Sequence, residues 1–261
     1  TLTDDLGRVV HLHRIPQRIV SLAPHATELL FDAGAGSQVV AVDVNSDEPQ
    51  SARALPRLSA HPQVDFERLT VARPDLIVVW RSGLSESTLQ RLSSLAPVFV
   101  SDPRRLQDIA KTLQRWSAIS NEPQHALRAQ QRASDQLTAL ESRHAHLPPV
   151  RVFYQVWRQP LITLSNSDVI GDAIRVCGGR NVFGHLPQPA PVVDVEAVLA
   201  ARPQLVLAPD PGVERDWRRL GLGDSTRTRF ATFDASALHR PTLRALDTVA
   251  RLCGVIDNAR S

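Results

Sequence analysis

The chain has 261 residues, 43% of them hydrophobic, so it is long enough to form about two globular domains. Its formal net charge is +3, and nearly all the positive charge is Arg, scattered along the chain rather than clustered with aromatic residues, which argues against nucleic-acid binding. No apolar run approaches the ~20 residues that a membrane-spanning helix needs. The start at Thr1 and the absence of Met favour a mature, processed chain, although a truncated chain would look the same.

The N-terminal segment is expected to form a small hairpin. Residues 1–13 alternate in character and turn at Asp5-Leu6-Gly7. His11 and His13 would lie on one face of the returning strand. Two His are too few for a metal site, so we interpret them as exposed strand residues.

The first core strand, residues 18–22, runs into a helix that begins near Pro24. Pro suits a helix start because its missing amide hydrogen would have no partner there. This turn puts Pro24 and His25 at the carboxyl end of a strand, where open α/β sheets bind ligands. His25 is therefore a candidate ligand contact; a capping or merely exposed His is the alternative.

One stretch of the chain occurs twice. Residues 65–79 are typical of a short helix that runs into a buried strand, and residues 194–208 repeat them. In both copies an Asp can cap the helix, a Glu follows two residues later in the first turn, and Arg-Pro ends the helix. The apolar run that follows suits a strand covered on both faces. Two copies predict two similar lobes, each with its own sheet; the alternative is that such units simply recur in α/β proteins.

The first copy is followed by Trp80 and Arg81, which begin a polar loop. A Trp at the carboxyl end of a strand can form a wall for a flat ligand. A Trp buried between helix and sheet is the alternative.

A long helical pattern runs from about residue 123 to 146, and Pro148-Pro149 ends it. His144 and His146 near its end are expected to be solvated. We place the lobe boundary after this helix. The predicted division is an N-terminal α/β lobe over residues 1–121, a linking helix over 122–148 and a C-terminal α/β lobe over 149–261.

The second lobe is predicted to open with a strand over residues 151–157 that carries aromatic residues near its end. A helix over 168–177 follows, and residues 210–223 are expected to be charged and irregular. A strand over 230–233, a loop over 234–241 and a terminal helix over 242–252 complete the chain.

The only two cysteines are Cys177 and Cys253, and neither has a metal-ligand neighbour at Cys-x-x-Cys spacing, so a zinc site is not expected. One pair in a processed chain suggests a disulfide and an oxidising compartment. Two unrelated buried thiols are the alternative.

Motifs that would indicate catalysis are missing from the sequence. There is no Gly-x-Ser-x-Gly, no Gly-x-x-x-x-Gly-Lys and no His-Glu-x-x-His. We therefore expect no enzyme activity, no catalytic residues, no bound metal and no resident cofactor.

Three segments together resemble a known family: residues 18–24 with Thr27-Glu28-Leu29, residues 74–77 with Trp80-Arg81, and residues 176–183. They are similar to the periplasmic binding proteins of ABC importers for cobalamin, haem and ferric siderophores, and most of all to those for cobalamin. The resemblance covers essentially the whole chain from Arg18. It implies two Rossmann-like α/β lobes joined by one long backbone helix, with the ligand in a cleft between the lobes.

The resemblance also implies roles for two pairs of residues. Cys177 and Cys253 match a pair that forms a disulfide. Glu67 and Glu196, one per lobe, match acids that dock into Arg sockets on the membrane permease; plain helix-start charges are the alternative. Arg–carboxylate pairs can be bidentate and directional, which suits a docking mark.

The same resemblance, with the strand-end argument above, gives a set of expected ligand-binding residues: Pro24, His25, His61, Trp80, Arg81, Gln155, Trp157, Asp234 and Arg240. This sequence departs from the cobalamin pattern at three places. His61 and Ala190 stand where that pattern has Trp, and Val156-Trp157 replaces Phe-Gly. Lost aromatic surface could weaken the hold on a corrin ring, and Trp157 and His25 could compensate.

The expected function is that of a monomeric periplasmic protein, exported with removal of a signal peptide, that captures a corrinoid and delivers it to an ABC permease. It would approach the membrane only through that permease. Haem or a ferric siderophore is the alternative ligand; haem is less expected because the only Tyr, Tyr154, lies in a core strand. An enzyme or metal-handling chaperone on the same fold, and an interaction protein that has lost its ligand, remain as further alternatives.

Overall fold

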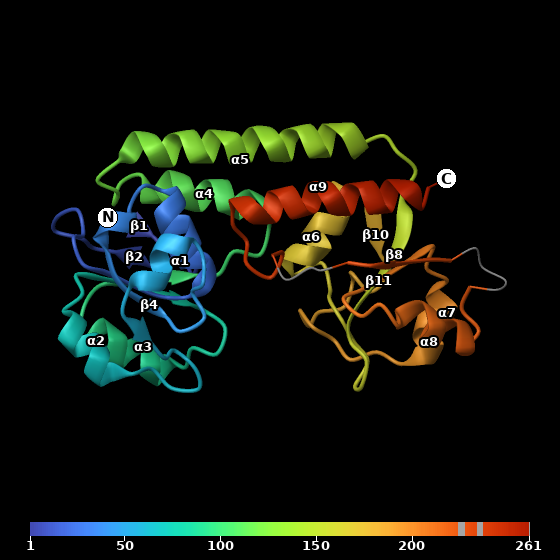
Figure 1. Cartoon of the computed structure of the whole chain (residues 1–261), viewed down its shortest axis with the longest axis horizontal. Helices are drawn as coiled ribbons and strands as arrows, with labels where there is room; N and C mark the ends of the chain where they lie inside the picture. Colours follow the sequence, from blue (N-terminus) through green and yellow to red (C-terminus); the bar gives the residue numbers. More distant parts are fainter. Residues whose placement is uncertain (224–227, 234–236, 261) are drawn as a thin grey trace. The chain divides into compact units, whose positions relative to one another are not determined.

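The computed structural model describes residues 1–223, 228–233 and 237–260. These fall into two compact units, residues 1–103 with 107–134 and residues 104–106 with 135–261. Each unit has its own mainly parallel sheet, as the repeated segment predicted (Figure 1). We call them the N-terminal and the C-terminal lobe.

The N-terminal lobe contains a parallel sheet in the order β5-β4-β3-β6-β7. The strands are β3 (Ile19–Leu22), β4 (Val39–Asp43), β5 (Arg57–Leu58), β6 (Leu76–Trp80) and β7 (Val98–Ser101). The helices are α1 (Pro24–Asp32), α2 (Phe66–Ala72), α3 (Glu86–Ser93) and α4 (Gln107–Trp116), with 3-10 turns at Gly36–Gln38 and Gln50–Ala54.

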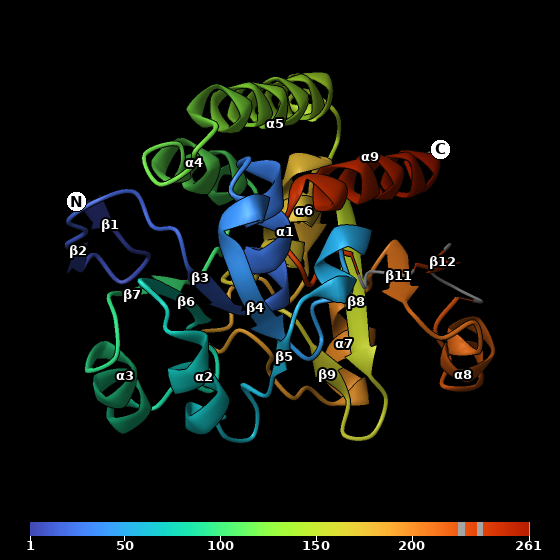
Figure 2. The same ribbon diagram turned by 60° about the vertical axis from the view of Figure 1, so that its left-hand side comes forward.

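Helices cover both faces of this sheet, with α1 and α4 on one side and α2 and α3 on the other (Figures 1 and 2). Val20, Ile77 and Val98 share a core with Leu69 of α2 and Leu92 of α3. Because strand side chains alternate, burying both faces requires the nearly continuous apolar strands that the sequence has.

A two-stranded hairpin, β1 (Leu2–Thr3) and β2 (Val9–Val10), precedes the sheet. It turns where the sequence predicted, and Gly7 adopts φ +77°, a conformation that favours glycine.

The C-terminal lobe contains strands in the order β10-β8-β11-β12, with β9 antiparallel to β8. The strands are β8 (Val150–Trp157), β9 (Ile162–Thr163), β10 (Gly179–Asn181), β11 (Leu205–Ala208) and β12 (Arg229–Thr232). The helices are α6 (Val169–Val176), α7 (Val195–Ala201), α8 (Val213–Arg219) and α9 (Leu243–Asn258). Phe153 and Val206 share a core with α7 and α8, while α6 and α9 pack together on the other face of the sheet.

One predicted irregular segment is in fact partly helical. Residues 213–219 form α8, in which Val213 and Trp217 are buried four residues apart on one face. An ion pair between Arg218 and Glu214 spans the same interval. The prediction was wrong because two apolar residues among charges give a weak helical pattern, although one of them is a large anchor.

The repeated segment forms the same structure twice. Asp65 accepts a hydrogen bond from Arg68 N at 3.0 Å, and Asp194 accepts one from Ala197 N at 2.6 Å. Both helices end at an Arg in the left-handed conformation, Arg73 at φ 45° and Arg202 at φ 46°. Proline at the next position disfavours the right-handed helical conformation there.

The likeness extends beyond the residues that the repeat covers. Arg18 Nε donates to the carbonyl oxygens of Ala72 and Arg73, and Arg151 Nε donates to that of Arg202. Arg18 directly precedes β3, and Arg151 is the second residue of β8, the first core strand of each lobe. They satisfy helix-end carbonyls that would otherwise lack partners.

The long helix α5 (Pro123–His144) contains the boundary between the two units, which falls between Ser134 and Asp135. The division of residues 122–148 as a separate linking helix stays a prediction. His144 is buried, contrary to expectation: its Nδ1 lies 2.7 Å from Leu140 O and its Nε2 3.3 Å from Asp257 of α9.

The disulfide between Cys177 and Cys253 is present, with the sulfurs 2.06 Å apart, so this prediction is confirmed. It joins the end of α6 to α9 within the C-terminal lobe. None of the helices in the part of the chain that the structure describes combines the length and apolar character needed to span a bilayer.

Candidate functional site

His25 lies in the first turn of α1, directly after Pro24 at the helix start. Its side chain is only 2% exposed. Its Nε2 lies 2.9 Å from Ser101 Oγ at the end of β7, and its ring meets Trp80 edge to face at 5.6 Å. The structure thus places His25 as a buried support for Trp80.

Trp80 ends β6 and is 39% exposed, so it is not enclosed between helix and sheet. Arg81 N donates to Ser101 O at 3.2 Å, and Arg81 Nη1 donates to Leu84 O at 2.9 Å. The guanidinium is therefore turned toward its own loop, while the indole of Trp80 offers an aromatic surface at the strand end.

His61 and Trp80 line the same pocket of the N-terminal lobe, which has a volume of about 280 Å³. A Cβ added to Gly83 would lie 2.5 Å from His61 Cε1, so the imidazole packs directly on that glycine. Gly83 follows Trp80 by three residues. The structure therefore brings together two expected ligand residues, His61 from a loop and Trp80 from the end of β6.

Gln155 of β8 is 6% exposed, and its Oε1 accepts a hydrogen bond from Trp217 Nε1 at 2.7 Å. Both side chains line a pocket of about 350 Å³ in the C-terminal lobe, together with Leu161 and Leu220. The amide nitrogen of Gln155 has no hydrogen-bond partner among residues 1–223, 228–233 and 237–260. Because its oxygen is occupied, Gln155 can offer a donor to a ligand.

Trp157 ends β8 and is 61% exposed, with its indole N–H donating to Gln159 O at 3.0 Å. Arg158 beside it pairs with Asp216 of α8 at 2.8 Å. Each lobe therefore has an exposed Trp at the end of a core strand.

Arg240 is half-buried, and its backbone N–H donates to Ala237 O. Asp234, in the same expected loop, lies outside the described residues. Nearby His239 acts electrostatically on Asp168, the cap of α6. Burial raises the pKa of the Asp168 carboxyl, and its hydrogen bond from Ile170 N and the field of His239 oppose that shift only in part.

Glu67 and Glu196 occupy the same place in α2 and α7, two residues after the capping Asp, and both are exposed. Neither carboxylate has a hydrogen bond or ion pair within the described part of the chain. Both are therefore available to an external partner.

The sequence analysis did not identify two residues that support the expected ligand residues. Ser101 holds His25, and Trp217 orients Gln155. The position of Ser101 at the end of a strand beside β6 was a usable signal, whereas Trp217 lies in the segment expected to be irregular. No group of three or more His, Cys, Asp or Glu side chains is arranged to hold a metal ion among the residues described.

Comparison with known proteins places this arrangement in a family. The family model for periplasmic binding proteins matches residues 19–229, which is most of the chain. This chain belongs to that family. Periplasmic binding proteins are solute-binding proteins of the periplasm rather than a class of enzymes, and they work with a small-molecule ligand and an ABC permease.

Individual members of the family are also similar over nearly the whole chain. The vitamin B12-binding protein of Vibrio parahaemolyticus is 30% identical over 243 residues, 91% of this chain and 88% of that protein. The structure of the periplasmic vitamin B12 binding protein BtuF of Vibrio cholerae aligns with a TM-score of 0.85 at 32% identity, covering 95% of this chain and 99% of that one. The periplasmic heme-binding protein RhuT from Roseiflexus sp. RS-1 aligns with a TM-score of 0.77 at 21% identity, covering 94% and 99%, and shares the fold.

Proposed function

We propose that this periplasmic binding protein captures a corrinoid, cobalamin, and delivers it to an ABC import permease. The observation that carries the proposal is its likeness to proteins named for vitamin B12 binding, which holds at 30% identity or more over about nine tenths of the chain.

The chemistry of the two strand ends supports a flat ligand with many amide groups. A corrin ring has broad apolar faces and carries amide side chains at its edge. Trp80 and Trp157 offer exposed indoles of the kind that stack on such faces. The amide nitrogen of Gln155 can donate to an amide carbonyl of the ligand.

The departures from the cobalamin pattern predict that this chain binds cobalamin less tightly than a protein with the full pattern, but tightly enough to capture it. His61 and Ala190 provide less aromatic surface than the Trp residues that the pattern has at these places. Trp157 adds an indole where the pattern has Gly. The proposed ligand residues remain Pro24, His25, His61, Trp80, Arg81, Gln155, Trp157, Asp234 and Arg240, with His25 acting through Trp80.

An anionic ferric siderophore or haem is the second candidate ligand, because Arg81, Arg158 and Arg240 could place positive charge toward an anionic ligand. Two observations weigh against it. Tyr154 is buried in β8 and cannot reach a bound iron without rearrangement of the core. Arg158 is already neutralised by Asp216.

Glu67 and Glu196 are proposed as the docking residues for the permease. Their identical helix positions and free carboxylates suit recognition by a pair of Arg side chains, which bind carboxylates in a bidentate manner. The protein is proposed to act as a monomer without a resident cofactor, in the periplasm after removal of a signal peptide.

Isothermal calorimetry with cyanocobalamin, and in parallel with hemin and a ferric siderophore, tests the ligand. We expect a one-to-one isotherm with cyanocobalamin at sub-micromolar order and no heat with the other two. Heat with hemin or the siderophore and none with cyanocobalamin would replace the proposed ligand while leaving the import role in place.

A further inference from the structure

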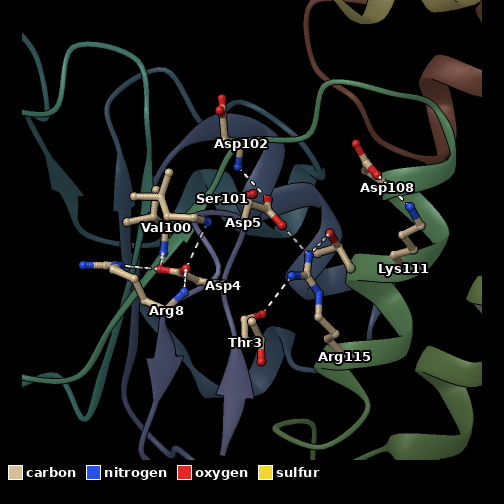
Figure 3. A network of polar contacts seen from close by, with 12 residues as sticks. Thr3, Asp4, Asp5, Arg8, Val100, Ser101, Asp102, Asp108, Lys111 and Arg115 are labelled. Carbon is tan, nitrogen blue, oxygen red and sulfur yellow. Dashed lines mark hydrogen bonds and ion pairs between the residues drawn. The ribbon is translucent and has the colours of Figure 1, made fainter.

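The N-terminal hairpin is bonded to one end of the edge strand of its lobe. Asp5 N donates to Val100 O at 3.0 Å, Val100 N donates to Asp4 Oδ2 at 3.3 Å, and Asp102 N donates to Asp5 Oδ2 at 2.6 Å. Figure 3 shows both carboxylates of the hairpin turn facing this stretch. The hairpin thus holds three backbone groups at or just after the end of β7: Val100 N, Val100 O and Asp102 N.

The two carboxylates are themselves firmly placed. Asp4 accepts from the backbone of Leu6 and Arg8 and from the Arg8 guanidinium, with Arg8 Nη2 at 2.6 Å. Asp5 accepts from Arg115 Nη2 of α4 at 2.5 Å, and Arg115 also donates to Thr3 O at 2.8 Å (Figure 3). Charge-assisted hydrogen bonds of this kind are about twice as strong as neutral ones.

Ser101 lies between Val100 and Asp102, whose backbone groups the hairpin holds, and its own polar groups bond on the side of β6 and α1. Its carbonyl accepts from Arg81 N, the residue directly after Trp80. Its hydroxyl lies 2.9 Å from His25 Nε2, and the His25 ring supports Trp80. Ser101 is fully buried, so a lost hydroxyl contact is not replaced by bulk water.

We infer that Ser101, fixed through Asp5, is a positioning residue that sets the orientation of the exposed Trp80 and so the affinity of the N-terminal lobe for its ligand. The ligand part of this inference rests on the function proposed above. The chain of contacts runs from Arg115 to Asp5, to the backbone beside Ser101, to His25 and to the indole. It gives the hairpin, which lies outside the expected ligand residues, a role in binding.

The first test observes Trp80 without any ligand. The four Trp residues are replaced by 5-fluorotryptophan, and the Trp80 fluorine resonance is assigned with Trp80→Phe. Ser101→Ala and Asp5→Asn should shift or broaden the Trp80 resonance, while those of Trp116, Trp157 and Trp217 stay in place. Ser101→Thr, which keeps the hydroxyl, should restore the wild-type position.

The second test measures cyanocobalamin affinity of the same proteins by calorimetry. Ser101→Ala should weaken binding about fivefold to tenfold, the range expected for one lost hydrogen bond. Asp5→Asn should weaken it less, because it acts one step further away, and Ser101→Thr should bind like the wild type.

A control separates positioning from simple loss of stability. Val98→Ala removes buried volume from the same strand without touching the contact chain and should lower the melting temperature at least as much as Ser101→Ala. It should leave both the Trp80 resonance and the affinity unchanged while the protein is folded. An unchanged Trp80 resonance in Ser101→Ala, or an equal change in Val98→Ala, would overturn the inference. If wild type does not bind cyanocobalamin, the proposed ligand is wrong, and the resonance test still decides the role of Ser101.

Discussion

The two copies of the helix-to-strand unit share their backbone but differ at the end of the strand. Both have a capping Asp, a free Glu in the first turn and an Arg in the left-handed conformation. The first copy then places the exposed Trp80 at its fifteenth position after the cap, whereas the second has Pro209 there. The carboxylates are thus duplicated, while the aromatic surface comes from β6 in one lobe and from β8 in the other. A partner that contacts the two helices could therefore offer each of them a similar binding site. A ligand that contacts the strand ends meets a different surface in each lobe.

The largest expected difference between the lobes is in stability, because only the C-terminal lobe has a disulfide. Replacing both Cys177 and Cys253 by Ser should lower the free energy of unfolding by about 4 kcal/mol on the chain-entropy model. Hydrogen exchange should show faster opening of β8, β11 and α9, with β3 and β6 less affected. An equal loss of hydrogen-exchange protection in both lobes would contradict a stabilising effect confined to the C-terminal lobe.

The two carboxylates proposed for docking, Glu67 and Glu196, should contribute equally to permease binding. Glu67→Ala and Glu196→Ala should each weaken binding to the permease by about 1.5–3 kcal/mol, the range for hydrogen bonds to charged groups. Transport into vesicles should fall similarly in both, with ligand affinity unchanged. Glu86→Ala is the matched control, since Glu86 is an exposed first-turn acid of α3 outside the repeat. Undiminished transport in the double variant Glu67→Ala with Glu196→Ala would refute the docking role.

The ends of the two repeated strands, in contrast, should contribute unequally to ligand binding. Trp80→Ala should weaken cyanocobalamin binding about tenfold, or ~1.4 kcal/mol, because an exposed stacking surface is lost. Pro209→Ala, at the equivalent position of the second copy, should bind as the wild type does. Calorimetry compares the two, and a similar loss in both would mean that the strand ends are equivalent after all.

A third capping Asp extends the comparison of Asp65 and Asp194. Asp168, which caps α6, is half-buried, and desolvation raises the pKa of its carboxyl. Its contribution to stability is therefore full below the unfolded pKa and is lost as pH rises through the higher folded pKa. Asp168→Asn keeps an acceptor for the cap and removes the charge, so it should gain stability over wild type toward pH 7 and lose this advantage in acid. Urea unfolding from pH 3.5 to 7.5 measures the difference, and a difference independent of pH would contradict this account.

Local sequence signals predicted the parts of the molecule that depend on local structure. The caps at Asp65 and Asp194, the hairpin turn at Gly7 and the ends of the core strands all follow from residue types within a few positions of one another. The single pair of cysteines suggested the disulfide, and the resemblance supported it. The docking role of Glu67 and Glu196 came from the resemblance and stays a prediction.

Contacts between distant segments were not predictable in this way. His144 looks like a solvated residue at a helix end, but α9 buries it through a contact with Asp257, more than a hundred residues later. Ser101 and His25 are 76 residues apart, and nothing in either neighbourhood signals their hydrogen bond. A single Trp217 among charges likewise gives little helical pattern until the pocket that buries it is known.

The hairpin has one more consequence, which concerns solubility. A strand such as β7 at the border of a sheet exposes unpaired backbone groups that can recruit a strand from another molecule. Asp4 and Asp5 occupy such groups at Val100 and Asp102. Proteolysis or a fusion that frays residues 2–10 would uncover this border, so such preparations should aggregate through it even while the sheet itself remains folded.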